Sequence, residues 1–481
     1  MRLPFIGRKQ ELNELSELLE KKTASLVVIQ GRRRIGKSRL VEEFAKPYTF
    51  YQFSGNPPTT ETTTQWQLDE FARQLSRQTK TPLIAADSWG NQFYLLYQQI
   101  KAGRVIVLFD EISWMGSKDP EFLGHLKTAW DIYFKKNPEL ILILCGSVSP
   151  WIEKNILSST GFVGRLSLRL TLEELSLSEC NQFWLQNGDY ISPYQKFKVL
   201  AVTGGVPRYL EEIKTSLSAE DTIRNLCFTK NGLLVHEFND IFSDLFSRRT
   251  PTYKRIVELL ANGSMEIKDI GEALDLAQSG ALSEYLDDLI KSGFVERDYT
   301  WLLSSGKSSR LSHFRLSDNY IRFYLKYIDP HLMKIEKNDF AYSSLSALPG
   351  WNSIMGLQFE NLVLRNRNYI KEALGLASQD IESNNPFFQR MTKKHPGCQI
   401  DYLIQTRFNI LYVCEFKFLK DAVGKGVINE VQQKIARLAP PKRFSILPVL
   451  VHVNGVSQEV VKSGFFAKII DFGNALGDQS R

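Results

Sequence analysis

The sequence predicts an α/β protein in four parts: a parallel sheet, a helical lid, a module of three helices and a hairpin, and a smaller α/β unit. Near-continuous apolar strands alternate with helical patterns from Leu26 to about Leu170, as in a parallel sheet covered on both faces. Helical spacing then dominates before the three-helix module, and strands and helices alternate again after about Ser344. The predicted parts are residues 1–175, 176–245, 246–330 and 344–475.

Length and composition fit a globular protein of several domains. The 481 residues suggest two to four domains at roughly 100–200 residues each. The net charge of +7 permits a polyanionic partner without requiring one. Five scattered cysteines without a C-x-x-C pair argue against a disulfide framework or zinc site and fit a reducing cytosol. The apolar runs are far shorter than the ~20 residues of a membrane span, so we expect a cytoplasmic protein.

The stretch GRRRIGKS, Gly31 to Ser38, matches G-x-x-x-x-G-K-[ST] in full, after one apolar strand and before an amphipathic helix. This context is typical of a P-loop, in which glycines free the backbone to wrap a phosphate at a helix N-terminus. Lys37 is expected to reach the β- and γ-phosphates, and the Ser38 hydroxyl to bind Mg²⁺. No Asn-Lys-x-Asp guanine motif is present, which favours ATP. The residues expected at the nucleotide are Gly31, Arg34, Ile35, Gly36, Lys37, Ser38 and Arg39.

Two further apolar strands end in polar residues. The strand RVIVLFD is followed by a second acid, so Asp110 is expected in the Mg²⁺ shell and Glu111 is placed to polarise the attacking water. The strand LILILCG ends at Ser147, either a sensor of the γ-phosphate or a plain turn serine. The pattern predicts an ATPase.

The segment FIGRKQELNELSELL, this P-loop, the LFDE strand and GGVPRYLEEI together resemble the archaeal-type (prokaryotic) ATPases of the AAA+/STAND group, over about Pro4 to Glu212. The resemblance implies that Phe5, Gly7 and Arg8 lie near the adenine, and that Pro207 and Arg208 form a nucleotide-sensing segment of the lid. It also makes Arg165 the candidate arginine finger; the alternative is an ion pair with a carboxylate at the rim of the sheet. Monomer, dimer and ring all remain open.

The three-helix module has the layout of a winged helix. Its second long helix, ALSEYLDDLIKSG, carries Glu284, Asp287 and Asp288 against one Lys291. DNA phosphates would repel such a helix, so a spacer or protein-contact role is favoured over sequence reading. Basic residues in the hairpin, Lys307 and Arg310, are better suited to a nucleic-acid backbone.

Two apolar strands near the C-terminus carry charges. Asp401 lies in QIDYLI, and Glu415 and Lys417 lie two residues apart in LYVCEFKF, so both point to one face of their strand. If the strands form a hairpin, Asp401 and Glu415 meet as oxygen ligands for Mg²⁺ or Mn²⁺. Lys417 would orient the hydroxide or stabilise phosphoryl charge during metal-assisted hydrolysis of a phosphodiester. A structural Glu–Lys ion pair is the alternative interpretation.

This arrangement resembles the PD-(D/E)xK nuclease superfamily, although the proline before the aspartate is missing. The resemblance implies a restriction-endonuclease-like domain, an assisting Glu360 on the leading helix, and Gln432 on the helix after the Glu-x-Lys strand. The whole layout resembles archaeal-type ATPases with a C-terminal DUF234 domain. Two main hypotheses follow: an ATPase coupled to a nuclease that acts on nucleic acid, with DNA favoured, or a nucleotide-dependent switch whose C-terminal module binds a partner without cutting. A plain ATPase with a structural tail is the third.

Overall fold

The computed structural model of the chain divides into two compact units, residues 1–174 and 175–481. No helix in the described part of the chain combines the length and apolarity needed to cross a membrane. The residues described are 4–57, 62–85, 87–117, 119–147, 150–185, 190–246, 250–276, 280–340, 344–393 and 396–477.

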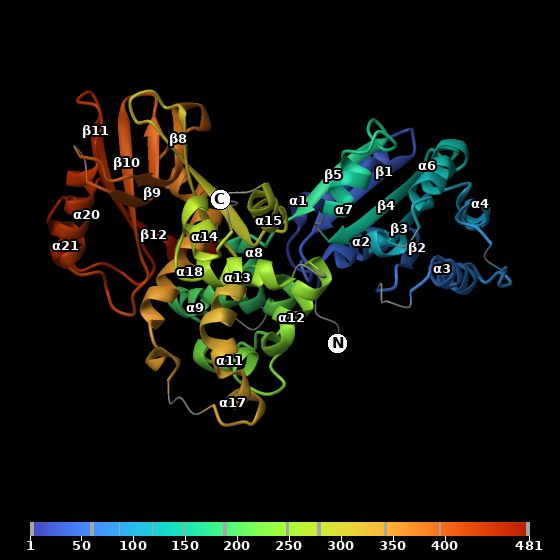
Figure 1. The fold of residues 1–481 in the computed structure, drawn as a ribbon, viewed down its shortest axis with the longest axis horizontal. Helices are drawn as coiled ribbons and strands as arrows, with labels where there is room; N and C mark the ends of the chain where they lie inside the picture. Colours follow the sequence, from blue (N-terminus) through green and yellow to red (C-terminus); the bar gives the residue numbers. More distant parts are fainter. Residues whose placement is uncertain are drawn as a thin grey trace. The chain divides into compact units, whose positions relative to one another are not determined.

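A five-stranded sheet forms the centre of the first unit (Figure 1). Its strands are β1 (Ser25–Gly31), β2 (Thr49–Ser54), β3 (Val105–Asp110), β4 (Leu140–Ser147) and β5 (Leu166–Leu172). The order is β2-β3-β4-β1-β5 and every pairing is parallel, which confirms the predicted parallel sheet.

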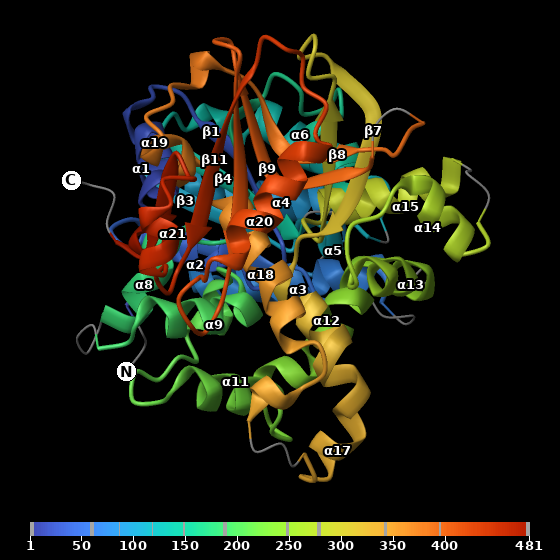
Figure 2. The same ribbon diagram turned by 90° about the vertical axis from the view of Figure 1, so that its left-hand side faces the viewer.

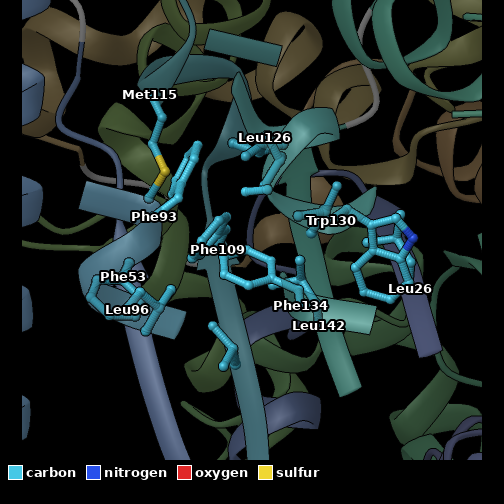
Figure 3. Close-up of a cluster of buried hydrophobic side chains, with 14 of the residues drawn as sticks. Leu26, Phe53, Phe93, Leu96, Phe109, Met115, Leu126, Trp130, Phe134 and Leu142 are labelled. Carbon is cyan, nitrogen blue, oxygen red and sulfur yellow. The ribbon is translucent and has the colours of Figure 1, made fainter. Parts of the chain in front are cut away.

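Helices cover both faces of this sheet, as expected for strands that are apolar along their whole length. Alternate residues of β1 point to opposite faces of the sheet. Val27 packs on the side of the first two helices, and Val28 packs on the side of the helices that follow them in the chain. Figure 3 shows the second cluster, where Phe93 of a covering helix lies beside Phe109 of β3. The helices of this unit are α1 (Lys9–Glu17), α2 (Lys37–Ala45), α3 (Thr64–Thr79), α4 (Trp89–Ile100), α5 (Ile112–Met115), α6 (Phe122–Ile132) and α7 (Pro150–Ile152).

The second unit begins with helices where the lid is predicted. They are α8 (Leu177–Leu185), α9 (Pro193–Thr203), α10 (Pro207–Leu210), α11 (Ala219–Cys227) and α12 (Leu233–Phe246). A buried helix, α16 (Asn319–Phe323), joins them to the rest of the unit. Tyr320 donates to the Leu234 carbonyl (2.9 Å), and the Asn319 amide donates to the Gln358 carbonyl (3.1 Å). The segment RLSDNYIRF therefore packs inside the second unit, as the sequence predicts.

The winged helix is present as predicted. It consists of α13 (Thr250–Leu260), α14 (Ile267–Ala273), α15 (Gly280–Lys291) and the antiparallel hairpin of β6 (Val295–Trp301) and β7 (Ser308–Leu316). Asp288 does not belong to the exposed acidic face of α15, because it is buried and accepts a hydrogen bond from the Tyr253 hydroxyl (2.6 Å). Glu284 and Asp287 are exposed.

A second five-stranded sheet, in the order β12-β11-β10-β9-β8, forms the C-terminal domain (Figure 2). Strands β8, β9 and β10 pair antiparallel, and β10, β11 and β12 pair parallel. This is a small mixed α/β domain. A short helix, α17 (Leu332–Glu336), precedes this domain in the chain. The elements of the domain are α18 (Trp351–Arg365), α19 (Asn368–Ala373), β8 (Ile381–Gln389), β9 (Cys398–Thr406), β10 (Ile410–Lys417), α20 (Gly426–Arg437), β11 (Ser445–His452), α21 (Gln458–Lys462) and β12 (Lys468–Asp471).

The hairpin of the winged helix packs on this second sheet. The Thr300 hydroxyl donates to the Phe388 carbonyl of β8 (3.2 Å), and the Trp301 indole donates to the Gln405 side chain of β9 (2.7 Å). Trp301 and Leu303 belong to the core cluster of the C-terminal domain. Part of the predicted wing is therefore buried against the C-terminal domain, although Lys307 and Arg310 near the tip of the wing are exposed.

Candidate functional site

The P-loop joins β1 to α2 and encloses its own lysine. Gly36 has φ 93°, a left-handed conformation that starts the helix at Lys37. The Lys37 ammonium donates to the carbonyls of Gly31 (3.0 Å) and Arg32 (3.2 Å). A Cβ at Gly31 would come within 2.8 Å of the Leu172 carbonyl oxygen, so β5 fixes a glycine there.

The two predicted Mg²⁺ ligands lie in contact. The Ser38 hydroxyl donates to Asp110 Oδ2 (2.6 Å), and Asp110 is only 8% exposed at the end of β3. Glu111 follows with φ 49°, a conformation that costs a non-glycine residue roughly 1–3 kcal/mol and tends to occur at functional sites. Its amide donates to Asp110 Oδ1 (3.1 Å). Two hard oxygen donors that meet beside a P-loop fit Mg²⁺ by their chemistry.

Ser147 lies at the same edge of the sheet. Strand β4 runs between β1 and β3, and Ser147 pairs in register with Gly31, where the P-loop begins. Its buried hydroxyl has no hydrogen-bond partner among the described residues. Whether Ser147 contacts a ligand or is a plain turn serine stays a prediction.

The predicted adenine segment braces the P-loop. The buried Arg8 has φ 61° and donates to the carbonyls of Ile35 (3.2 Å) and Glu173 (2.6 Å). The Ile35 side chain belongs to the hydrophobic core, and Phe5 packs partly buried on the same cluster. Sequence reasoning missed the pair between Arg32 of the P-loop and Glu174 (3.3 Å), although the run of three arginines was a signal.

A second polar cluster lies in the C-terminal domain. Strands β9 and β10 are adjacent and antiparallel, and the Cys414–Tyr402 pair places Asp401 directly opposite Glu415. The sequence prediction that these carboxylates meet across two strands is confirmed. Glu415 is 3% exposed, and Asp401 accepts a hydrogen bond from the Phe416 amide at Oδ2 (2.9 Å).

A lysine that sequence reasoning missed lies between the two carboxylates. The Lys434 ammonium on α20 contacts Asp401 Oδ1 (3.0 Å) and Glu415 Oε2 (2.5 Å). Gln432, predicted for this position, is exposed. Because α20 turns the Val427, Val431 and Lys434 positions toward the sheet at helical spacing, Gln432 lies off that face.

Lys417 contacts Glu415 Oε1 (3.1 Å) and Glu430 Oε2 (2.6 Å). Burial and the Asp401 charge raise the pKa of Glu415, while Lys434 and Lys417 oppose the rise. Burial lowers the pKa of Lys434, but the two carboxylates outweigh it and raise that pKa overall. The cluster is thus a set of mutually dependent ion pairs.

Glu360 on α18 acts on this cluster through its charge. Burial, and then the Asp401 carboxylate, raise the pKa of Glu360 to about 7, with Arg315 and Arg322 opposing the rise. Among the described residues, no three His, Cys, Asp or Glu side chains are arranged to hold a metal ion. Glu360 therefore does not join Asp401 and Glu415 as a third ligand in this arrangement.

Comparison with known proteins identifies the first part of the chain. Residues 5–213 match a family model described as an ATPase domain predominantly from Archaea. These residues form an archaeal-type ATPase domain. Residues 250–297 match a helix-turn-helix model described as bacterial regulatory protein, arsR family.

Relatives and solved structures also resemble the chain. An uncharacterized protein, MJECL04 of Methanocaldococcus jannaschii, is 28% identical over 74% of this chain and 76% of its own length. The Walker-type ATPase paby2304 of Pyrococcus abyssi has a TM-score of 0.48 at 18% identity, over 67% of this chain and 96% of that one. The Aeropyrum pernix ORC2 protein, in ADPNP–ADP complexes, has a TM-score of 0.43 at 14% identity, over 71% and 97% of the two chains.

Within the ATPase domain, Arg165 does not reach its own P-loop. It forms two hydrogen bonds with Asp131 (3.0 and 2.9 Å), and this arginine holds the pKa of Asp131 at about 2. Leu166, the next residue, pairs with Leu26 near the start of β1, about 17 Å of strand from the P-loop edge. The alternative ion pair at the rim of the sheet is therefore present, and a role of Arg165 as an arginine finger toward a neighbouring copy stays a prediction.

The predicted lid residues belong to the second unit. Pro207 starts α10, and Arg208 contacts Glu212 (2.6 Å) and Glu211 (3.5 Å). Their role in nucleotide sensing stays a prediction.

Proposed function

We propose that the archaeal-type ATPase domain binds and hydrolyses ATP. The contact between Ser38 and Asp110, with Glu111 next in the chain, carries this proposal. Ser38 and Asp110 would hold Mg²⁺, which supplies charge stabilisation at the phosphates when bound. Lys37 would exchange its carbonyl partners for phosphate oxygens, and the α2 N-terminus would add backbone N–H groups.

Hydrolysis needs a base and a way to distinguish the γ-phosphate. Glu111 directly follows Asp110, and its left-handed backbone turns the chain out of the strand. It would accept a proton from the attacking water. The unpaired Ser147 hydroxyl, on the strand between the P-loop and Asp110, would donate to a phosphate oxygen.

Lys37→Ala tests this proposal, with Lys46→Ala as the matched control at the exposed end of the same helix. We expect Lys37→Ala to abolish ATP hydrolysis and Lys46→Ala to leave it unchanged. Equal turnover in both variants would refute the assignment.

We further propose that the C-terminal domain hydrolyses phosphodiesters in DNA. The support is the Asp401–Glu415 pair across β9 and β10, with Lys417 beside it. The donors fit a hard cation by type, and such a cation would activate water and stabilise phosphoryl charge when bound. Lys417 would neutralise charge on the phosphate. The winged helix resembles DNA-binding modules, but its exposed Glu284 and Asp287 favour a contact role over base reading.

A specific observation favours the second candidate, a switch that binds without cutting. Lys434 already forms an ion pair with each carboxylate, as a structural cluster would require. Plasmid and linear DNA, incubated with Mg²⁺ or Mn²⁺ and with or without ATP, separate the two functions. We expect metal-dependent cleavage that Asp401→Asn and Glu415→Gln abolish, while Gln432→Ala cleaves normally. DNA binding without cleavage by the wild type would favour the switch.

A further inference from the structure

Every oxygen of the Asp401–Glu415 pair has a partner within the protein. Lys434 contacts one oxygen of each residue, the Phe416 amide donates to the other Asp401 oxygen, and Lys417 contacts the other Glu415 oxygen. A divalent cation that binds through these oxygens must replace at least part of this network.

Lys434 is the member that such a cation would replace. Its ammonium bridges the two carboxylates, because it lies 3.0 Å from an Asp401 oxygen and 2.5 Å from a Glu415 oxygen. Lys417 touches Glu415 alone and has a second partner in Glu430 at 2.6 Å, so it can stay paired. Lys434 lies on α20, whereas the carboxylates lie on the sheet, so its side chain can withdraw without moving a strand.

We propose that Lys434 is an internal cation that holds the carboxylate pair together in the resting protein and competes with the divalent cation for it. The inference rests on the metal-dependent function proposed for this domain, and adds a residue that neither the family models nor the sequence motif singles out. Displaced from the carboxylates, the Lys434 ammonium becomes free to pair with a phosphate of the substrate. Cation binding and phosphate binding would then assist one another.

Competition between Lys434 and a divalent cation predicts the direction in which the affinity for the cation changes when Lys434 is removed. Removing the ammonium leaves Asp401 and the buried Glu415 facing each other without their shared counter-ion, an arrangement that favours any cation able to replace it. Lys434→Met should therefore bind a divalent cation at least about tenfold more tightly than the wild type. It should also be less stable without the cation and gain more melting temperature when the cation is added.

Mn²⁺ alone, titrated into the full chain by calorimetry, tests the proposal. All proteins carry Asp110→Asn, so that cation binding at the P-loop does not contribute. Lys434→Met is compared with Lys425→Met, which removes an exposed lysine at the start of the same helix. Lys434→Gln is a second variant, for use if the methionine variant does not fold. Melting curves with and without Mn²⁺ give a second readout.

We expect tighter Mn²⁺ binding in Lys434→Met alone, and loss of that binding when Glu415→Gln is added. Equal affinity in Lys434→Met and the wild-type cluster would overturn the competition while leaving the metal site intact. Binding that survives Glu415→Gln would also overturn it, since the cation would lie elsewhere. If none of the proteins binds Mn²⁺, both this inference and the proposed metal-dependent hydrolysis fail.

Discussion

Loss of the Arg315 side chain should strongly destabilise the second unit. It lies on β7 with 6% exposure and donates to Asp298 on β6 (2.7 Å), to Glu296 (2.7 Å) and to Asn361 on α18 (2.5 Å). It thereby ties the winged-helix hairpin to the C-terminal domain. Arg315→Met would leave Asp298, 2% exposed, as a buried charge without this partner.

Breaking a buried ion pair from one side costs about 3–5 kcal/mol, whereas replacing both partners with apolar residues is often nearly neutral. We therefore expect Arg315→Met to destabilise the second unit by about that amount, and Asp298→Leu combined with Arg315→Met to recover most of it. Glu296 is half-exposed and stays hydrated in both variants.

Urea unfolding of the full chain measures the change in stability, and amide hydrogen exchange in β6 and β7 shows whether the change lies in the hairpin. Faster exchange in the single variant and recovery in the double variant is the predicted pattern. A loss below about 1 kcal/mol, or a double variant as unstable as the single one, would refute the idea that the buried Arg315–Asp298 pair stabilises the second unit.

Two further predictions concern carboxyl groups whose pKa values are shifted in the folded protein. Because the pKa of Glu360 rises to about 7 in the folded state, its proton stabilises the fold below pH 4.5, and this contribution fades as the pH rises to 7. Between pH 5 and pH 8, the free energy of unfolding of the wild type should fall by about 2–3 kcal/mol, and Glu360→Gln should not show this fall. The same pH dependence of the free energy of unfolding in both proteins would contradict the prediction. Since Arg165 keeps the pKa of Asp131 at about 2, their pair stabilises the ATPase domain above pH 4 and is lost as the pH falls to 2. Arg165→Ala should reduce acid-sensitive stability but change ATP turnover less than twofold, and a tenfold loss of turnover would show that Arg165 acts on a neighbouring copy.

The sequence was most informative where the chemistry is local. The P-loop lies within eight consecutive residues, and the strands around it are apolar throughout, so neither depends on distant contacts. The opposition of Asp401 and Glu415 followed from strand alternation and one short turn. In each case, the spacing along the chain determines the geometry.

Features that depend on packing were missed. Whether Gln432 or Lys434 meets the carboxylates is decided by the rotation of α20 against the sheet, which helical spacing alone does not fix. Strand β8 is hard to predict from the sequence, because Pro386 interrupts it at a register shift. The wing appeared as a surface hairpin because nothing local shows that Trp301 packs into the neighbouring domain.

The most direct test of the account is ATP turnover and ATP affinity measured together for Glu111→Gln. If Glu111 is the base at a working P-loop, turnover should fall at least about 100-fold while the dissociation constant for ATP changes less than about threefold. Turnover equal to that of the wild type would contradict the assignment of this residue, and with it the proposed chemistry of the ATPase site.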